Sequence, residues 1–270
     1  MRISAHDVGF RIGPKVILDR VRLTLHPGEL VGLIGPNGAG KSTLLHLLAS
    51  LRQPSTGQVR YDDRPAGRWR RRAIARRIAF LAQSGEVSPP MRVERLVSLG
   101  RLPHRSMMGG PSRADRDAVE NAMARADVLA FRDRAVGTLS GGERRRVLLA
   151  RALAVEADSL LADEPIAELD PRHQLQVMEL LRQAARDGRS VVVVLHDLTL
   201  AARFCDRLVL LDRGRVVAEG SHACVLDDAH VARAFGITLV RAAQDNAPVV
   251  VPWARLGNDG QSGERVGGTS

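Results

Sequence analysis

Apolar residues in this chain gather into short runs, and the longer stretches between these runs place apolar residues at helical spacing. Turn residues bound the runs, a pattern that is typical of strands buried on both faces. The predicted strands are residues 30–34, 78–81, 159–162 and 191–195. The predicted helices include residues 43–51, 93–99, 114–130 and 141–154. This alternation of strands and helices predicts an α/β fold around a parallel sheet.

The pattern changes near both ends of the chain and in its middle. Residues 2–31 alternate partly between apolar and polar positions, which predicts β structure before the first buried run. Residues 86–138 contain only helical pieces, so we expect an α-helical subdomain inserted into a single domain that spans residues 1–236. Residues 237–256 indicate a small β hairpin, and the polar, glycine-rich residues 257–270 indicate a flexible tail.

Composition and charge narrow the class of protein. Lys and Arg number 40 against 30 Asp and Glu, and the net charge of +10 permits nucleic acid, an anionic membrane face or an acidic protein as partner. Aromatic residues make up only 3%, which argues against stacking platforms for single-stranded nucleic acid. Two cysteines provide no disulfide framework and fit a reducing compartment. No apolar stretch approaches the ~20 residues that cross a bilayer, and no signal-peptide core is present, so we expect a soluble subunit.

The first buried run leads into a glycine-rich segment that matches the phosphate-loop pattern G-x-x-x-x-G-K-[ST] at every fixed position. A helix follows directly, which is the strand–loop–helix context that this motif requires. Glycines let backbone N–H groups surround phosphate oxygens, and the helix directs its positive end to the same place. The pattern therefore predicts a nucleotide-phosphate site formed by Gly35, Pro36, Asn37, Gly38, Ala39, Gly40, Lys41, Ser42 and Thr43.

Two side chains of this loop carry specific chemistry. Lys41 offers a compact positive charge to the β- and γ-phosphates, and Ser42 offers a hydroxyl to Mg²⁺. The only other lysine of the chain is Lys15, because arginine fills the remaining basic positions. The retention of lysine at position 41 suggests that a planar guanidinium does not fit the phosphate cradle.

Polar side chains follow three of the other buried runs. Asp163 can hold Mg²⁺ opposite Ser42, and the adjacent Glu164 can polarise an attacking water. His196 lies after the last buried run and is a candidate sensor of the γ-phosphate at the edge of the sheet. Gln83 follows a short apolar strand, from which its amide can reach a bound ion or a water.

A Leu-Ser-Gly-Gly-Glu segment begins the helix predicted over residues 141–154. Ser140 and Glu143 have the spacing of a capping box. Two glycines in the first turn weaken a helix, which makes sense if a ligand approaches the backbone N–H groups there. The alternative is an ordinary capped helix.

Three other features also have ordinary alternatives. Residues 68–77 contain six arginines, which is typical of a solvated helix face, although an acidic partner or a lipid headgroup surface also fits. Phe10 is available to stack on an adenine ring or to pack in the core. Asp170, with Pro171 after it, is expected to cap a helix.

The order of the motifs in this chain resembles that of the ATP-binding subunit of ABC transporters. The motifs are, in chain order, the phosphate loop, Gln83, the Leu-Ser-Gly-Gly-Glu segment, the Asp-Glu pair, Asp170 and His196. The resemblance covers about residues 2–236. It implies a P-loop NTPase core with an antiparallel β subdomain and an inserted α-helical subdomain. It also implies hydrolysis of ATP with Mg²⁺ as cofactor.

The resemblance assigns roles to individual residues. Residues 35–43 correspond to the Walker A loop, Asp163 to the Mg²⁺ carboxylate and Glu164 to the general base. Gln83 corresponds to the Q-loop glutamine, which reaches the metal and couples the nucleotide state to the membrane subunit. His196 corresponds to the switch histidine. Ser140, Gly141 and Gly142 correspond to the family's signature motif, which touches the γ-phosphate held by the other subunit. Asp170 corresponds to the D-loop, and Phe10 falls near the adenine-stacking tyrosine of the family.

Within the family, residues 100–104 and 195–202 resemble importers of iron-siderophore, haem and cobalamin. This resemblance implies a homodimer in the ATP state, a polytopic membrane permease, a periplasmic or surface substrate-binding protein, and a peripheral location at the cytoplasmic face of the membrane. No nucleic-acid partner is expected. The alternative is a soluble ABC-type ATPase of DNA repair, translation or cofactor assembly, which usually carries insertions that this sequence lacks. A regulator without turnover is disfavoured by Glu164 and His196.

Overall fold

The computed structural model describes residues 1–83, 91–106 and 110–256. Its central sheet has six strands in the order β10–β9–β3–β8–β7–β6. All neighbouring pairs are parallel except β9 and β10. The strands are β3 (Leu30–Ile34), β6 (Ile78–Leu81), β7 (Ser159–Asp163), β8 (Ser190–Val194), β9 (Arg207–Asp212) and β10 (Arg215–Gly220). The predicted buried runs are thus strands of one α/β sheet, as expected.

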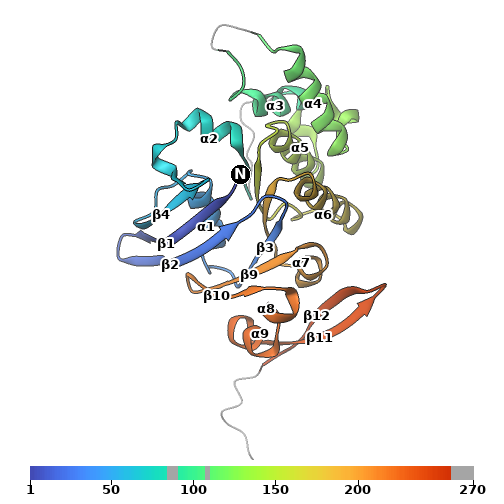
Figure 1. The fold of residues 1–270 in the computed structure, drawn as a ribbon. Helices are drawn as coiled ribbons and strands as arrows, with labels where there is room; N and C mark the ends of the chain where they lie inside the picture. Colours follow the sequence, from blue (N-terminus) through green and yellow to red (C-terminus); the bar gives the residue numbers. More distant parts are fainter. Residues whose placement is uncertain (84–90, 107–109, 257–270) are drawn as a thin grey trace, which may run out of the picture.

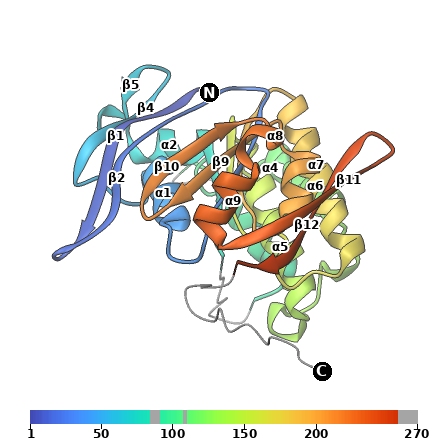
Figure 2. The ribbon, with the colours of Figure 1, turned by 90° about the horizontal axis from the view of Figure 1, so that it is seen from below.

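A second, antiparallel sheet covers one face of the molecule, in the order β2–β1–β4–β5. Its strands are β1 (Ile3–Ile12), β2 (Lys15–Leu25), β4 (Thr56–Tyr61) and β5 (Arg64–Pro65). Helix α1 (Lys41–Leu48) packs its leucines into the core between this sheet and the central one. Figure 2 shows the antiparallel strands on one side of the molecule and the larger helices on the other.

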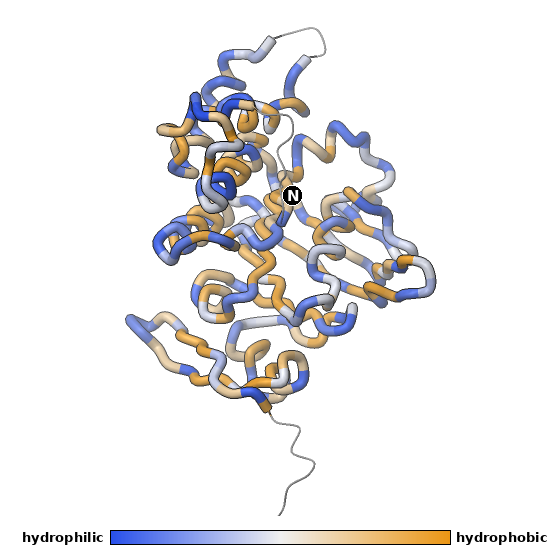
Figure 3. The backbone as a smooth tube through the Cα atoms, turned by 180° about the vertical axis from the view of Figure 1, so that it is seen from behind, coloured by the Kyte–Doolittle hydropathy of each residue, from blue (hydrophilic) through white to orange (hydrophobic). Residues whose placement is uncertain are grey.

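Two hydrophobic cores lie on the two faces of the central sheet, because successive side chains of a strand point to opposite faces. Val192 and Val194 of β8 join the core with α1, whereas Val191 and Val193 join the core on the opposite face. Both sets are buried, which explains why β8 is an unbroken run of valines. The central strands are mostly hydrophobic in Figure 3, and the tip of the last hairpin is hydrophilic.

The helices occupy different positions around these two sheets (Figure 1). Helices α3 and α4 contact α5 and lie at one end of the molecule, beyond the sheet (Figure 1). Helix α4 is shorter than predicted, because the chain turns at Asp127, whose φ is +54°. The helices are α2 (Arg71–Arg77), α3 (Val93–Ser98), α4 (Arg113–Arg125), α5 (Gly141–Leu153), α6 (Pro171–Arg186), α7 (Leu198–Phe204), α8 (His222–Val225) and α9 (Asp228–Phe235), with short 3-10 turns at Ala66–Arg68, Leu99–Arg101, Leu129–Phe131 and Val136–Thr138. In the part of the chain that the structure describes, no helix is long and apolar enough to span a membrane.

The strands β11 (Ile237–Gln244) and β12 (Ala247–Arg255) pair in an antiparallel hairpin within the range 237–256, where the sequence pattern indicates one. The hairpin lies against α7, where the Thr199 hydroxyl donates to the carbonyl of Val250 at 2.5 Å. Val250 is the residue of this hairpin that enters the core. The predicted tail at residues 257–270 lies outside the described residues.

The arginine run at residues 68–77 is only partly a solvated face. Arg72 and Arg76 each donate to the carbonyl of Pro103 at 2.8 Å. Arg77 pairs with Asp62 and with Asp158 at 2.8 and 2.6 Å. Three of the six arginines therefore join α2 to neighbouring segments. Each guanidinium has several N–H donors, so it can bind more than one carbonyl or carboxylate.

Candidate functional site

The carboxyl ends of four neighbouring parallel strands meet at one edge of the central sheet. The glycine-rich loop follows β3, Glu164 follows β7, and His196 lies two residues beyond β8. Gln83 follows β6, the edge strand. Ligands of open α/β sheets bind at this edge, where strand order reverses. The strand order therefore brings these predicted residues together although they are far apart in the chain.

The glycine-rich loop requires glycine at the two positions that the motif specifies. Gly35 has φ +146°, and a Cβ there would lie 2.0 Å from the carbonyl oxygen of Leu211. Gly40 has φ +102°, and a Cβ there would lie 2.7 Å from a methyl carbon of Leu18. Gly40 is also the N-cap of α1, and no side chain caps this end. The free N–H groups of the first turn are therefore available to an anion.

Lys41 is the most buried cation of the site, with an exposed fraction of 6%. Its ammonium donates to the carbonyls of Gly35 and Pro36 at 2.7 and 2.9 Å. Burial lowers the pKa of Lys41, and the negative charges of Glu164 and Asp163 oppose this shift. The loop thus holds a compact positive charge among its own carbonyls, a position from which it can contact phosphate oxygens.

Asp163 is a buried carboxyl group that the protein alone leaves incompletely satisfied. Its exposed fraction is 2%, and its Oδ1 atom has no hydrogen-bond partner among the described residues. Burial raises the pKa of Asp163, while interaction with the Ser42 hydroxyl lowers it. A cation beside Asp163 and Ser42 would satisfy this oxygen. Carboxylate and hydroxyl oxygens suit Mg²⁺, which keeps waters and substrate oxygens as its other ligands.

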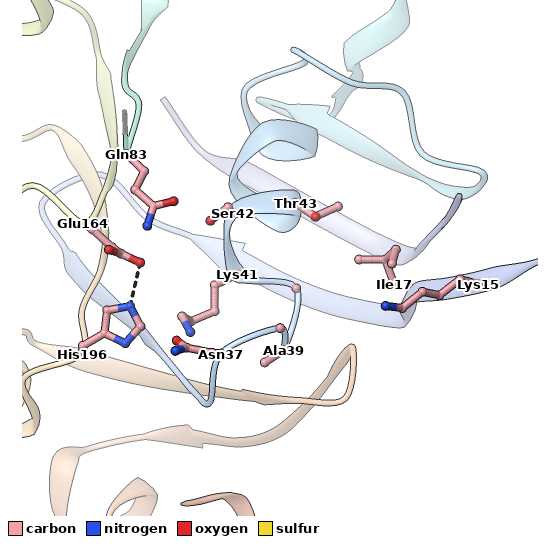
Figure 4. Close-up of a pocket in the computed structure, with 12 residues that line it drawn as sticks. Lys15, Ile17, Asn37, Ala39, Lys41, Ser42, Thr43, Gln83, Glu164 and His196 are labelled. Atoms are coloured by element: carbon pink, nitrogen blue, oxygen red, sulfur yellow. Dashed lines mark hydrogen bonds and ion pairs between the residues drawn. The ribbon is translucent and has the colours of Figure 1, made fainter. Parts of the chain in front are cut away.

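Glu164 and His196 form a hydrogen-bonded pair at the mouth of the site. The imidazole Nε2 lies 2.6 Å from Oε1 of Glu164 (Figure 4). Burial alone would raise the pKa of Glu164, but the hydrogen bond and charge of His196, together with Gln83 and the charge of Lys41, outweigh it, so the pKa lies below its ordinary value. The carboxylate is thus kept ionised, as a general base requires.

These residues line one cavity of about 620 Å³, a volume in the range of small-molecule sites. Figure 4 shows Gln83, Glu164 and His196 on one side of Lys41, with Lys15 and Ile17 on the other. The lining residues are Lys15, Ile17, Asn37, Gly38, Ala39, Gly40, Lys41, Ser42, Thr43, Gln83, Glu164 and His196.

Lys15 and Ile17 are members of the cavity that the sequence analysis did not identify. The lysine count contained a signal, since both lysines of the chain line this cavity. Phe10, the expected adenine-stacking residue, does not belong to the lining. Its half-buried ring packs against the core and lies 5.6 Å below the guanidinium of Arg52. The stacking prediction for Phe10 therefore finds no support in the position of its ring.

The other predicted contact residues lie away from this cavity. Ser140 caps α5, since its hydroxyl accepts from the N–H of Glu143 and the Glu143 carboxylate accepts from the N–H of Ser140. A Cβ on Gly141 would lie 2.5 Å from a carboxylate oxygen of Glu168. Asp170 caps α6 by accepting from the N–H of His173. Neither segment lines the cavity, but the two lie close together, since a Cβ on Gly142 would lie 3.3 Å from the carbonyl oxygen of Glu168.

The described residues contain no preformed cluster of metal-binding side chains. No three His, Cys, Asp or Glu residues gather there in a way that could hold a metal ion. Ser42 and Asp163 would supply only two protein ligands to a cation, with Gln83 nearby in the cavity lining. Such a site suits a cation that arrives with substrate phosphates.

Comparison with known proteins identifies the family. The ABC transporter family model matches residues 18–167. The hemin import ATP-binding protein HmuV of Streptomyces coelicolor is 49% identical over 219 residues, covering 80% of this chain and 77% of that protein. The protein of the same name from Rhodococcus jostii is 42% identical over 254 residues, covering 93% of this chain and 86% of its own length.

Solved structures agree with this relationship. The inward-facing structure of a metal-chelate type ABC transporter superposes with a TM-score of 0.79 at 25% identity, covering 93% of this chain and 97% of that chain. A dimeric ATP-binding cassette bound to ADP and phosphate superposes with a TM-score of 0.73 at 31% identity, covering 82% of this chain and 98% of that chain. With its P-loop NTPase core and the order of its motifs, the chain belongs to the ABC transporter family, in which it is an ATP-binding and ATP-hydrolysing subunit.

Proposed function

We propose that this chain drives the import of haem through a separate membrane permease by hydrolysing ATP. The observation that carries the ATPase part is the single cavity that joins residues 37–43 to Gln83, Glu164 and His196. The haem part is supported by relatives named hemin import proteins, which are 42% and 49% identical to this chain. Growth and uptake experiments that compare haem, ferric siderophores and cobalamin test the choice of cargo.

The phosphate loop binds the triphosphate of ATP in this proposal. Its backbone N–H groups and the first turn of α1 surround the phosphate oxygens, and Lys41 neutralises the β- and γ-phosphates. Ser42 and Asp163, with Gln83 beside them, would hold Mg²⁺, and the orphaned Oδ1 of Asp163 supports this assignment. When bound, Mg²⁺ would neutralise charge on the same phosphate oxygens.

Glu164 and His196 carry out the proton chemistry. The ionised carboxylate of Glu164 takes a proton from the attacking water, whose oxygen bonds to the γ-phosphorus as the bond to the β-phosphate oxygen breaks. His196, 2.6 Å from this carboxylate, orients it and is placed to contact the γ-phosphate. Gln83 lies on the same side of the cavity and is placed to sense the products.

Two copies of the chain complete the site. Ser140, Gly141 and Gly142 form the N-terminus of α5, where the first N–H groups of the helix lack helical partners, but they do not line the cavity of their own chain. We assign them to the nucleotide of a second copy, packed head to tail, with Asp170 near the same interface. A solved dimeric cassette with a TM-score of 0.73 to this chain supports such a pairing. The site residues are therefore contributed by both copies in the ATP-bound state.

The membrane partners follow from the importer assignment. A polytopic permease carries the cargo across the bilayer, and the helical subdomain, beside Gln83, is the surface that we assign to it. The subunit then lies at the cytoplasmic face of the membrane as a peripheral protein. A substrate-binding protein outside the membrane delivers the cargo to the permease.

Lys15 adds a second positive charge to the nucleotide site. It is the only basic residue besides Lys41 and His196 in the cavity lining, and its ammonium lies on the side of β2 that faces the loop (Figure 4). We expect Lys15→Met to weaken ATP and ADP binding by about twofold to fivefold, since an exposed charge pair contributes up to about 1 kcal/mol. Titration calorimetry at low salt measures this change.

The neighbouring Arg11→Met variant is the matched control for Lys15. Arg11 is an exposed cation of the same hairpin that does not line the cavity. Its removal should leave nucleotide affinity unchanged. Equal effects in the two variants would contradict a direct role for Lys15 and indicate only a general electrostatic effect.

Deletion of the gene should abolish growth on haem as the sole iron source, because import without an ATPase subunit has no energy source. Growth on a ferric siderophore and uptake of labelled cobalamin measure the other two cargoes in the same strain. Restoration of growth by the wild-type gene, but not by one encoding Glu164→Gln, ties the phenotype to ATP hydrolysis. If growth on haem is unaffected, the cargo assignment is wrong.

The soluble alternative predicts a different result. A soluble ABC-type ATPase of DNA repair would leave all three uptake measurements unchanged and would bind duplex DNA with a strong dependence on salt. Electrophoretic mobility shifts at two salt concentrations, with the purified full-length chain, separate the two functions.

A further inference from the structure

Arg145 is a buried arginine that lies at the ends of two strands of the active site. It belongs to α5, five residues after Ser140, and its exposed fraction is 7%. One terminal nitrogen donates to the carbonyl of Ala82 at 3.0 Å and to that of Gln83. The other donates to the carbonyl of Asp163 at 2.7 Å and to that of Glu164. One guanidinium thus joins the carboxyl ends of β6 and β7.

Burial of this charge would be unfavourable without these four acceptors. Burial lowers the pKa of Arg145, while the negative charges of Glu164 and Asp163 oppose the shift. The planar guanidinium directs its two terminal nitrogens to two separate pairs of carbonyls. An ammonium could not reproduce this geometry, because its donors radiate from one atom.

The contacts restrain the backbone at Glu164. This residue has φ +50°, a left-handed conformation that is unfavourable for any residue with a Cβ atom. The carbonyls of Asp163 and Glu164 belong to the two peptide planes that flank the Glu164 Cα atom. Because one nitrogen of Arg145 holds both carbonyls, it limits rotation of both planes. The direction of the Glu164 side chain, and its contact with His196, depend on that restraint.

We propose that Arg145 is a positioning residue for ATP hydrolysis: it holds Glu164 and Gln83 in their reacting arrangement and ties both to the signature helix α5. This inference rests on the proposed function, in which Glu164 is the general base. Because α5 begins at residues 140–142, the same residue connects the site of one copy to the segment that completes the site of the other. A displacement of α5 would therefore reach the base through the contacts of Arg145.

The chain offers a matched control in the next residue. Arg146 also lies on α5 and has an exposed fraction of 8%. It donates to the carbonyl and the carboxylate of Asp127, at 2.8 and 2.9 Å, on the side of the helical subdomain. Replacement of either arginine removes a buried guanidinium from the same helix, but only Arg145 contacts the nucleotide site.

The test compares Arg145→Gln, Arg145→Lys and Arg146→Gln with the wild-type full-length chain. We expect Arg145→Gln to lower kcat about 100-fold, since a displacement of reacting groups by about 1 Å can cost that much. The Kd for ATP should not change, because the phosphate loop keeps its contacts. Arg145→Lys retains the charge and should lose less activity, which provides a folded variant if the glutamine variant does not fold. Arg146→Gln should keep the wild-type kcat.

Thermal unfolding and ATP titration accompany the kinetic measurements. A wild-type kcat in both Arg145 variants would overturn the proposal. So would an equal loss of kcat in Arg146→Gln at a similar loss of thermal stability, because the effect would then be structural. Assay of Glu164→Gln in parallel keeps the two proposals apart. If that variant is inactive while the Arg145 variants are fully active, only the role of Arg145 is wrong.

Discussion

Replacement of Lys41 by alanine is expected to abolish ATP hydrolysis and to weaken ATP binding by about 10- to 100-fold, because a hydrogen bond to a charged group contributes about 1.5–3 kcal/mol. Lys41 is the buried cation of the phosphate loop, and its ammonium is held by the carbonyls of Gly35 and Pro36. Alanine removes the countercharge of the β- and γ-phosphates while the glycines still shape the loop. Nucleotide titration and phosphate release, measured on the folded variant, test this result.

Lys41→Arg provides a sharper version of the same experiment. It keeps the positive charge, but the guanidinium is larger and planar, whereas Lys41 is buried beneath the loop with an exposed fraction of only 6%. We expect this variant to lose hydrolysis as well. Wild-type binding and turnover in Lys41→Ala would exclude the phosphate-loop assignment, and full activity in Lys41→Arg would show that charge alone is sufficient.

Glu164→Gln should reduce the rate of hydrolysis by about 10²- to 10⁴-fold, the usual cost of losing a general base. The amide keeps the size of the side chain but cannot accept the proton of the attacking water. ATP should still bind, because Lys41 and the loop are unchanged. The variant should therefore accumulate in an ATP-bound dimer, which light scattering detects with Mg·ATP and not with Mg·ADP.

The pH dependence of hydrolysis provides a second test of Glu164. Burial raises the pKa of Glu164, but His196, Gln83 and Lys41 together outweigh burial and lower it, so the ionised base persists below the ordinary pKa of glutamate. The wild-type rate should fall on the acid side only as the pH passes through this lowered pKa. The residual rate of Glu164→Gln should lack that limb. A full hydrolysis rate in Glu164→Gln would falsify the role of the base.

Local features of this chain could be predicted from the sequence because they depend on neighbouring residues. The phosphate loop is specified by glycines at positions 35 and 40, whose φ values of +146° and +102° a side chain would disfavour. The capping box of α5 is specified by the spacing of Ser140 and Glu143. The unbroken apolar runs predicted the parallel strands, since both faces of such strands are buried.

The positions of Gln83, Glu164 and His196 after buried runs predicted that they lie at the edge of the sheet, and the resemblance to a family assigned them to one site with the loop. Composition and periodicity do not specify which strands are neighbours, and strand order here is not chain order. The pairing of β3 with β8, and of β7 with β6, depends on contacts between segments far apart in the chain. Those long-range pairings are what place the four strand ends side by side.

The sequence by itself thus determined the phosphate loop, its helix, the capped helices and the α/β class, since each depends on short-range sterics and hydrogen bonding. Only the tertiary structure decided that Lys15 and Ile17 enter the cavity and Phe10 does not, because the register of β1 and β2 orients these side chains. It also decided that Arg145 spans the ends of β6 and β7. Four carbonyls at the ends of these two strands accept hydrogen bonds from one guanidinium of α5, and no spacing of residues along the chain predicts this contact.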